Sequence, residues 1–141
     1  MISIRYVTDK DKEFWLSMDG HTSEDGFNLK VFGKLGYVIF ANEAPIGILH
    51  YSLLWDNMPF LNFINIKQEY RKLGYGKNAI NYWENEMLQQ GFKMVLLSTQ
   101  VDEKAQFFYR NLGYQDCGCL VLNNCPLEQP MEMFLYKILQ S

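Results

Sequence analysis

The sequence predicts one domain built on a mixed α/β sheet with helices on both faces. Apolar runs of strand length alternate with amphipathic stretches of helix length from residue 2 to residue 139. In the second half, an apolar strand, a helix at 77–90 and another apolar strand follow in turn, which predicts a parallel step with a helical crossover. Of the 141 residues, 48% are apolar and 16% aromatic, so a single domain over 1–141 can bury a substantial core.

The first half of the chain predicts two helices and an antiparallel hairpin. The helices have capping residues at their starts and glycines near their ends. The expected elements are a strand at 2–7, a helix capped by Thr8 that ends at Asp19-Gly20, a helix at 24–32 closed by Gly33, a strand at 37–41, a turn at 42–45 and a strand at 46–55. Residues 56–59 are expected to break the chain before the next strand.

The second half predicts a β-α-β-α-β-β order. The helix at 77–90 is amphipathic and is expected to end in a left-handed cap at Gly91. The other expected elements are a strand at 61–66, a turn at 71–76, a strand at 92–99, a helix capped by Asp102 and closed by Gly113, and strands at 114–122 and 131–139 around a loop at 123–130. Ala105, Phe108, Tyr109 and Leu112 share one face of the last helix.

Composition narrows the class of protein. No run of about 18 apolar residues predicts a membrane span, and the N-terminus lacks the pattern of a secretory signal. The three cysteines, Cys117, Cys119 and Cys125, are typical of reduced thiols in a cytoplasm, and both histidines, His21 and His50, are too far away in sequence to suggest a zinc site. A formal net charge of −3 argues against nucleic-acid binding.

The turn at 71–76 is the strongest candidate for a ligand site. An apolar strand leads through a glycine-containing turn into a helix N-terminus, where unpaired N–H groups and the helix dipole favour an anion. The turn is not a P-loop, because no G-x-x-x-x-G-K-[ST] occurs. It is not a dinucleotide fingerprint either, because no strand with a ribose-binding acid follows at the expected distance, and the next strand has Lys93 at its start instead.

Two motifs, in this order, carry a resemblance to a known family. Arg71, Gly74 and Gly76 form R-x-x-G-x-G, and residues 105–114 match A-x-x-F-Y-x-x-x-G-[FY]. Together they resemble the acyl-CoA loop and the following helix of the GNAT acetyltransferase superfamily. The resemblance covers the element order of nearly the whole chain, with residue-level matches over about 61–114. It implies a twisted, mostly antiparallel sheet of about seven strands and acetyl-CoA as the acyl donor.

The resemblance also implies a place for each part of the cofactor. The CoA pyrophosphate is expected on the backbone amides of Lys72, Leu73, Gly74, Tyr75, Gly76 and Lys77, with Arg71 shaping the loop. The pantetheine arm is expected along Asn65, Ile66 and Lys67, across a splay between strands 61–66 and 93–99. Asp102 stands where many members have an asparagine that contacts pantetheine, although a helix cap is the alternative role. Tyr109 matches a tyrosine that lies near the thioester sulfur.

The implied reaction, acyl transfer from a thioester to an amine, has three requirements. The amine must lose its proton, because a lysine-type amine with a pKa near 10.4 is only about one part in a thousand neutral at pH 7. A strand-end N–H, of Ile66 or Lys67, can stabilise the carbonyl oxygen. Tyr109 is the residue expected to protonate the leaving thiolate, although a packed core aromatic is its alternative role.

The general base is not identified by the sequence. The strand before the loop carries no carboxylate, and the candidates elsewhere are Asp56, Glu132, His50 and His21. Each of them could equally be a surface or structural residue, and a chain of water molecules could replace a single base. A ping-pong route through a cysteine would need an activated thiolate, for which no basic partner is visible.

The acceptor pocket is expected among the N-terminal helices and the hairpin. Aromatic and acidic residues there would suit an organic cation: Trp15, Phe27, Phe32, Tyr51 and Trp55, with Asp19, Glu24, Asp25 and Asp56. The same residues could instead form core and solvated surface.

The sequence therefore predicts a cytoplasmic, acetyl-CoA-dependent N-acetyltransferase without a metal, acting on a small primary amine in a ternary complex. The alternatives are a protein N-terminal or lysine acetyltransferase and a non-catalytic acyl-CoA sensor. A tRNA-acetylating enzyme is disfavoured by the acidic net charge. The chain is expected to be a monomer or a homodimer.

Overall fold

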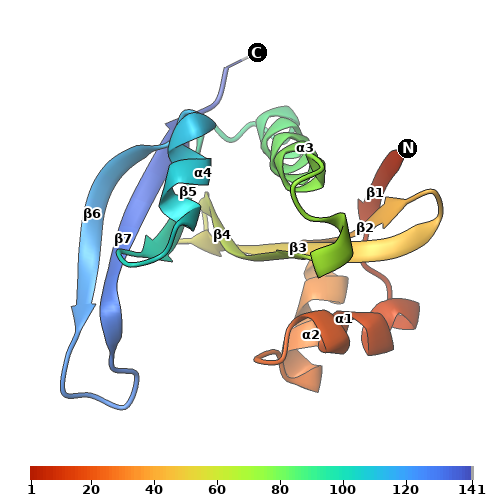
Figure 1. The fold of residues 1–141 in the computed structure, drawn as a ribbon, viewed down its shortest axis with the longest axis horizontal. Helices are drawn as coiled ribbons and strands as arrows, with labels where there is room; N and C mark the ends of the chain where they lie inside the picture. Colours follow the sequence, from red (N-terminus) through yellow and green to blue (C-terminus); the bar gives the residue numbers. More distant parts are fainter. Residues whose placement is uncertain (141) are drawn as a thin grey trace. The chain divides into compact units, whose positions relative to one another are not determined.

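The computed structural model describes residues 1–140 (Figure 1). Its strands are β1 (Ile2–Tyr6), β2 (Gly36–Ala41), β3 (Ala44–Leu54), β4 (Met58–Ile66), β5 (Met94–Gln100), β6 (Gln115–Leu122) and β7 (Gln129–Ile138). Its helices are α1 (Lys12–Met18), α2 (Glu24–Gly33), α3 (Tyr75–Gln89) and α4 (Ala105–Asn111), with short 3₁₀ turns η1 (Asp9–Asp11) and η2 (Gln68–Tyr70). Within these residues the strands form one seven-stranded sheet in the order β1-β2-β3-β4-β5-β7-β6. The predicted fold class is confirmed.

The chain forms two compact units, of which the first comprises residues 1–52 and 61–85. In this unit β1 pairs antiparallel with β2, and β2 pairs antiparallel with β3. The predicted hairpin is thus confirmed, but its tip is only Asn42-Glu43, because β3 already begins at Ala44. Both tip residues have positive φ, 50° and 74°. Such a turn matches the natural twist of the two strands.

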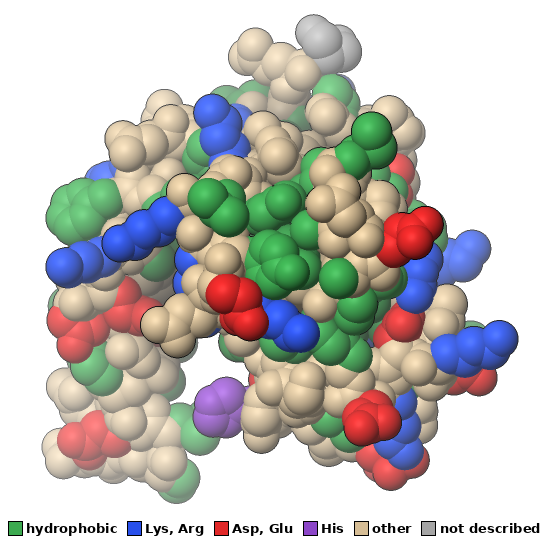
Figure 2. All heavy atoms as spheres, turned by 45° about the vertical axis from the view of Figure 1, so that its right-hand side comes forward, with side chains coloured by type: hydrophobic (Ala, Val, Ile, Leu, Met, Phe, Trp, Pro, Cys, Tyr) green, Lys and Arg blue, Asp and Glu red, His purple; other side chains and the backbone are tan. Residues whose placement is uncertain are grey.

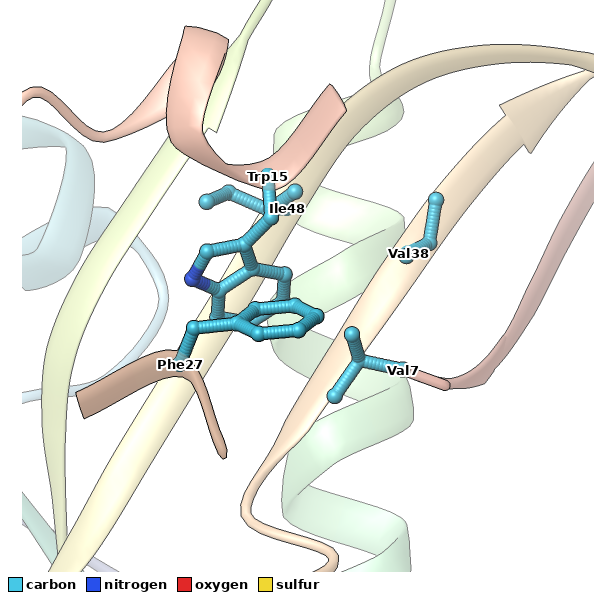
Figure 3. Close-up of a cluster of buried hydrophobic side chains, with 5 residues drawn as sticks. All are labelled: Val7, Trp15, Phe27, Val38 and Ile48. Atoms are coloured by element: carbon cyan, nitrogen blue, oxygen red, sulfur yellow. The ribbon is translucent and has the colours of Figure 1, made fainter. Parts of the chain in front are cut away.

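Helices α1 and α2 cover one face of the first unit's strands through large apolar side chains. The rings of Trp15 and Phe27 meet edge to face with centroids 5.9 Å apart (Figure 3). Three aliphatic side chains complete this cluster: Val7, Val38 and Ile48. Trp15 is 0% exposed and Phe27 is 1% exposed. Full burial of a Phe-sized side chain contributes about 1.5–3 kcal/mol, so these two rings are the main anchors of the two helices.

Helix α3 covers the opposite face of β2 and β3, as Figure 1 shows. Tyr82 packs edge-on against Tyr37 of β2 at 5.4 Å, and Trp83 packs against Tyr51 of β3 at 5.8 Å between ring centroids. Successive side chains of a strand point to opposite faces, so Tyr37 meets α3 while its neighbour Val38 meets α1 and α2. The predicted cover of helices on both faces is confirmed in this unit.

The second unit comprises residues 53–60 and the chain from Glu86 onward. In it β7 pairs antiparallel with both β5 and β6. Leu97 of β5 lies opposite Leu135 of β7, and both side chains are buried. Helix α4 ends at Asn111, and Gly113, which was predicted to close it, follows in a left-handed conformation with φ +98°.

The starts of α1, α3 and α4 and the end of α2 differ from the prediction. Helix α2 continues through Gly33 and ends at Lys34, which takes the left-handed conformation (φ 55°). A Cβ on Gly33 would lie 3.1 Å from the side chain of Leu35, which would have to shift slightly. Helix α3 begins at Tyr75, two residues earlier than predicted, so Gly76 lies inside its first turn with a helical backbone.

The predicted break at 56–59 is also too long. The turn covers Trp55 to Asn57, and β4 begins at Met58, so Pro59 lies within the strand. The other strands agree with their predicted ranges to within one or two residues, and the helix predicted at 24–32 is present as α2. Boundaries of this kind depend on hydrogen bonds that side-chain patterns do not specify.

Candidate functional site

The anion site is predicted in the segment between β4 and α3. After β4, the chain makes the η2 turn, and the N–H of Arg71 bonds to Gln68 O at 3.2 Å. Lys72 and Gly74 both have positive φ, 63° and 91°. Nothing lies within 4 Å of a Cβ placed on Gly74, so its backbone angle, not the available space, favours glycine there. The N–H of Asn78 then donates to Gly74 O at 3.0 Å, the first bond of the helix.

The backbone N–H groups of residues 72–77 remain available at this end of α3. No hydrogen bond from any of them is found within the described residues 1–140. The first turn of α3 contains no Asp or Glu that could compete for an anion. Arg71, Lys72 and Lys77 are exposed beside these N–H groups. Unpaired donors, the positive end of the helix dipole and three cations together favour a phosphate.

The Arg71 side chain links the loop to the end of β4 through two hydrogen bonds. Its Nε donates to Ile66 O at 2.7 Å, and its Nη2 donates to Asn65 Oδ1 at 3.1 Å. A guanidinium has five N–H protons, so three remain for a ligand. The expected loop-shaping role of Arg71 thus has a geometric basis in bonds to the last two residues of β4.

The end of β4 distinguishes its two candidate N–H groups. The N–H of Lys67 donates to Ile46 O of β3 at 2.7 Å and is therefore engaged within the fold. Neighbouring residues of a strand direct their N–H and C=O groups to opposite sides, so the Ile66 groups point away from β3. The bond from Arg71 to Ile66 O agrees with that direction. Of the two N–H groups expected to stabilise an acyl oxygen, that of Lys67 is bonded to β3, whereas that of Ile66 points away from β3.

Tyr109 lies on α4, in the second unit. It is 8% exposed, and its ring meets that of Tyr114 at 5.8 Å between centroids. Burial, followed by the negative charge of Glu103, raises the pKa of the Tyr109 hydroxyl to about 12. The phenol is therefore protonated throughout the physiological pH range and can donate a hydrogen bond.

Asp102 does not cap α4. The residue preceding the helix is Lys104, and no side chain caps it. Asp102 lies exposed in the turn before it, and the carboxylate that bonds backbone there is that of Glu103, which accepts from Gln100 N at 3.1 Å. The predicted cap is wrong because α4 begins two residues later than a helix capped by Asp102 would.

His50, one of the candidate bases, belongs to a buried hydrogen-bonded pair with Asp19. Its Nε2 donates to Asp19 Oδ2 at 2.9 Å, and its ring lies between Trp15 and Phe63. Its Nδ1 is buried and has no partner within residues 1–140. Burial lowers the pKa of His50, as does the charge of Lys30, whereas Asp19 acts in the opposite direction.

Asp19 itself organises the turn between α1 and α2. Its carboxylate accepts hydrogen bonds from Thr22 Oγ1, His50 and the N–H of His21. Burial alone would raise the pKa of Asp19, but these hydrogen bonds outweigh burial and lower it. Asp19 and His50 therefore form a structural tie between the α1–α2 turn and β3.

The other residues expected to act as a base or to line an acceptor pocket are dispersed. His21 and Asp56 lie exposed in turns, and Glu132 lies half-buried on β7. Trp15, Phe27 and Tyr51 are buried in the core, whereas Phe32 and Trp55 are 89% and 76% exposed. The alternative interpretation agrees with these positions, since the three buried residues belong to the core and the other two to the surface.

Cys117 shows no sign of an activated thiol. Cys117 and Cys119 are exposed on β6, and burial together with the charge of Asp116 raises the pKa of the Cys117 thiol. A raised pKa disfavours the nucleophilic thiolate. Within residues 1–140, no three His, Cys, Asp or Glu side chains group closely enough to hold a metal ion, and no helix is long and apolar enough to cross a membrane. Figure 2 shows basic and acidic side chains interspersed on one face.

Comparison with known proteins identifies the family. Residues 4–114 match the model of the acetyltransferase (GNAT) family. The chain belongs to this family, which implies acyltransferase activity. A sequence comparison with curated proteins found no significant match.

Solved structures share the fold at low sequence identity. Ard1 from Thermoplasma volcanium is 14% identical with a TM-score of 0.84, and 99% of each chain is covered. A putative streptothricin acetyltransferase from Bacillus anthracis, in complex with acetyl coenzyme A, is 17% identical with a TM-score of 0.84 and the same coverage. Naa50 from Arabidopsis thaliana, in complex with the bisubstrate analogue CoA-Ac-MVNAL, is 14% identical with a TM-score of 0.79, covering 96% of this chain and 97% of that one.

Sequence reasoning missed the side chain of Asn65. It named this residue for its backbone, whereas the structure shows its amide bonded to both Arg71 and Met18 O. It also missed the pairing of Asp19 with His50, which are 31 positions apart. No spacing rule links such residues, so no signal in the sequence could have found either contact.

Proposed function

We propose that this protein is an N-acetyltransferase that moves the acetyl group of acetyl-CoA to the primary amine of a small molecule, by direct attack in a ternary complex. The row of unpaired N–H groups at the start of α3, behind a loop braced by Arg71, carries this proposal. Such a row binds a pyrophosphate, and the chain belongs to a family of acetyltransferases.

Each part of the donor has a proposed partner. Residues Lys72 to Lys77 hold the pyrophosphate through their N–H groups, and the unused protons of Arg71 add charge-assisted hydrogen bonds. The pantetheine arm runs along the end of β4, at Asn65 to Lys67. There the N–H of Ile66, directed away from β3, bonds the acyl oxygen and stabilises the negative charge that develops as the amine attacks.

Tyr109 is proposed to assist the leaving sulfur. With a pKa of about 12, its hydroxyl is a weaker acid than a thiol, whose ordinary pKa is about 8.5. It therefore stabilises the departing thiolate by donating a hydrogen bond rather than by giving up its proton completely. The amine is proposed to lose its proton to water, because Asp19 and His50 are bonded to each other within the fold.

Direct transfer is favoured over a cysteine intermediate. The burial and the neighbouring Asp116 that raise the pKa of Cys117 work against formation of a nucleophile. The acceptor is proposed to be small by likeness to the streptothricin enzyme, whereas likeness to Naa50 supports the alternative, a protein N-terminus or lysine. A non-catalytic sensor of acyl-CoA is the remaining alternative.

The first test is calorimetric titration of the protein with acetyl-CoA, using ATP and NAD as controls. Micromolar binding of acetyl-CoA alone would support the proposal. Equal binding of all three, or of none, would mean that the segment at 71–76 is only a turn. A screen of small amines and of peptides, with released CoA thiol as readout, then distinguishes the acceptor classes.

Replacing Tyr109 by Phe tests the proposed mechanism. We expect kcat to fall by about 10²-fold or more while the Kd for acetyl-CoA is unchanged, because the hydroxyl acts only as the sulfur departs. Tyr114→Phe, in the neighbouring ring, is the matched control and should retain activity. Unchanged turnover in Tyr109→Phe would remove this residue from the mechanism, and no turnover in any protein that binds CoA would favour the sensor.

A further inference from the structure

The side chain of Asn65 lies between two elements that are far apart in sequence. Its Oδ1 accepts from Arg71 Nη2 at 3.1 Å, and its Nδ2 donates to Met18 O at 3.0 Å. The amide has one orientation only. Turned over, its NH₂ would face a guanidinium and its oxygen would face a carbonyl. Asn65 thus connects the proposed phosphate loop to the end of α1.

On the loop side, the connection passes through one guanidinium. Arg71 bonds two consecutive residues of β4, at Asn65 Oδ1 and Ile66 O, and is otherwise exposed beside the unpaired N–H groups. A phosphate that accepts from its remaining protons shares the same rigid, planar group. A ligand that moves the guanidinium would therefore also move the side chain of Asn65, to which it is bonded.

On the α1 side, Asn65 bonds to the residue before the α1–α2 turn, and Asp19 holds that turn together through several hydrogen bonds. Met18 is the last residue of α1, and Asp19 caps it. The Asp19 carboxylate holds His21 N at 3.0 Å, Thr22 Oγ1 and His50 Nε2. A shift of the Met18 carbonyl would therefore carry the α1–α2 turn, residues 19–23, with it.

We propose that Asn65 is a positioning residue that couples occupation of the phosphate loop to the position of the α1–α2 turn. Asn65 directly precedes Ile66, whose N–H is proposed to bond the acyl oxygen, so the turn lies beside the place where the amine must attack. Binding of the donor sets this turn before the acceptor arrives. The proposal rests on the proposed function, because it takes CoA as the ligand of the loop.

Hydrogen–deuterium exchange with and without CoA tests the coupling without any knowledge of the acceptor. In the unchanged protein we expect CoA to slow exchange of the amides at 19–23 by about threefold or more. In Asn65→Leu, of similar volume, CoA should still bind through the loop N–H groups, about fivefold more weakly, and exchange at 19–23 should no longer respond. Asn62→Asp, an exposed position on the same strand, is the control and should respond like the unchanged protein.

A second variant separates coupling from simple loss of stability. Asn65→Asp keeps the acceptor for Arg71 but lacks the donor to Met18 O, so it should still bind CoA while losing the response at 19–23. A merely structural role would speed exchange equally with and without CoA in both variants. An unaltered CoA response in Asn65→Leu or Asn65→Asp would overturn the proposal.

Calorimetry on the same samples distinguishes the two levels of failure. If the unchanged protein binds CoA and the amides at 19–23 do not respond, the coupling is absent and the proposed function stands. If the unchanged protein binds no CoA, both the proposed function and the coupling are overturned.

Discussion

The two ends of α3 have glycines of nearly the same geometry and opposite hydrogen-bonding states. Gly74 precedes the helix with φ +91° and Gly91 follows it with φ +96°, and nothing lies within 4 Å of a Cβ placed on either. At the far end, Gly91 N donates to Leu88 O and Phe92 N to Met87 O, each at 3.0 Å. These two bonds form a Schellman motif, which satisfies the last carbonyls of the helix.

At the near end the first N–H groups have no partner within residues 1–140, and three basic side chains lie beside them. A helix terminus without internal partners is stable only when water or a ligand supplies them. The same local conformation thus completes the helix at Gly91 and leaves N–H groups without an internal partner at Gly74. The glycine itself does not indicate function, whereas the unpaired donors around it do.

Separate substitution of Gly74 and Gly91 should give the largest difference in CoA affinity between two variants. Gly74→Ala and Gly91→Ala each place a side chain in a left-handed conformation, and each should lower the free energy of unfolding by about 1–2 kcal/mol. Only Gly74→Ala should weaken CoA binding, by about tenfold or more, because it redirects the N–H groups of the loop. Thermal melts and calorimetry on both variants measure the two effects. Equal loss of CoA affinity in both would show that affinity follows general stability.

A carboxylate added at the start of α3 should lower CoA affinity about tenfold, whereas one added at its end should not. Lys77→Glu places a negative charge in the first turn, where it stabilises the helix by about 0.3–1 kcal/mol but repels a pyrophosphate. We expect a raised Tm and a CoA affinity lower by about tenfold. Gln89→Glu is the control at the other end and should lower Tm slightly without affecting affinity. A lowered Tm in Lys77→Glu would contradict the assignment of unpaired N–H groups to this end.

The sequence predicted what depends on local pattern and missed what depends on distant contacts. The strands, the helices and the glycine-containing loop before α3 follow from hydrophobic period and turn chemistry, which act over a few residues. The bonds of Asn65 to Met18 O and of His50 to Asp19 join residues 47 and 31 positions apart, and no local pattern specifies them. For the same reason, Trp15 and Phe27 could be named as aromatic residues of the region but not assigned to its core.

The pH dependence of stability tests His50, a polar group that has a partner within the fold, unlike the N–H groups of the loop. The pKa of His50 is lowered by burial, so the unfolded chain binds a proton more readily than the folded one. The free energy of unfolding should therefore fall as pH drops below about 6.5, by up to about 1.4 kcal/mol per pH unit. The lowered pKa of Asp19 adds a further loss only below about pH 4.

Denaturant unfolding of the unchanged protein and of His50→Gln between pH 7.5 and 5 measures this contribution. The variant should be less stable at neutral pH and less sensitive to acid. Because the chain has only two histidines, the imidazole signals of His50 can also be followed directly by NMR. A titration midpoint for His50 above 6.5 would contradict the direction of the shift.

The smallest expected effect concerns a third left-handed helix end. At the end of α2, Lys34 N donates to Val31 O and Leu35 N to Lys30 O, the same motif as at Gly91, but the left-handed residue is Lys34. Lys34→Gly should remove about 1 kcal/mol of backbone strain. Part of that gain should be lost, because the Lys34 ammonium lies over the ring of Tyr6 at 5.9 Å and the variant lacks this contact. We expect a net stabilisation of about 0.5 kcal/mol, measured by thermal melts, with unchanged CoA affinity. Destabilisation by Lys34→Gly would show that the contact with Tyr6 outweighs the backbone strain, and that a left-handed helix end in this chain is set by its side chain as well as by its backbone.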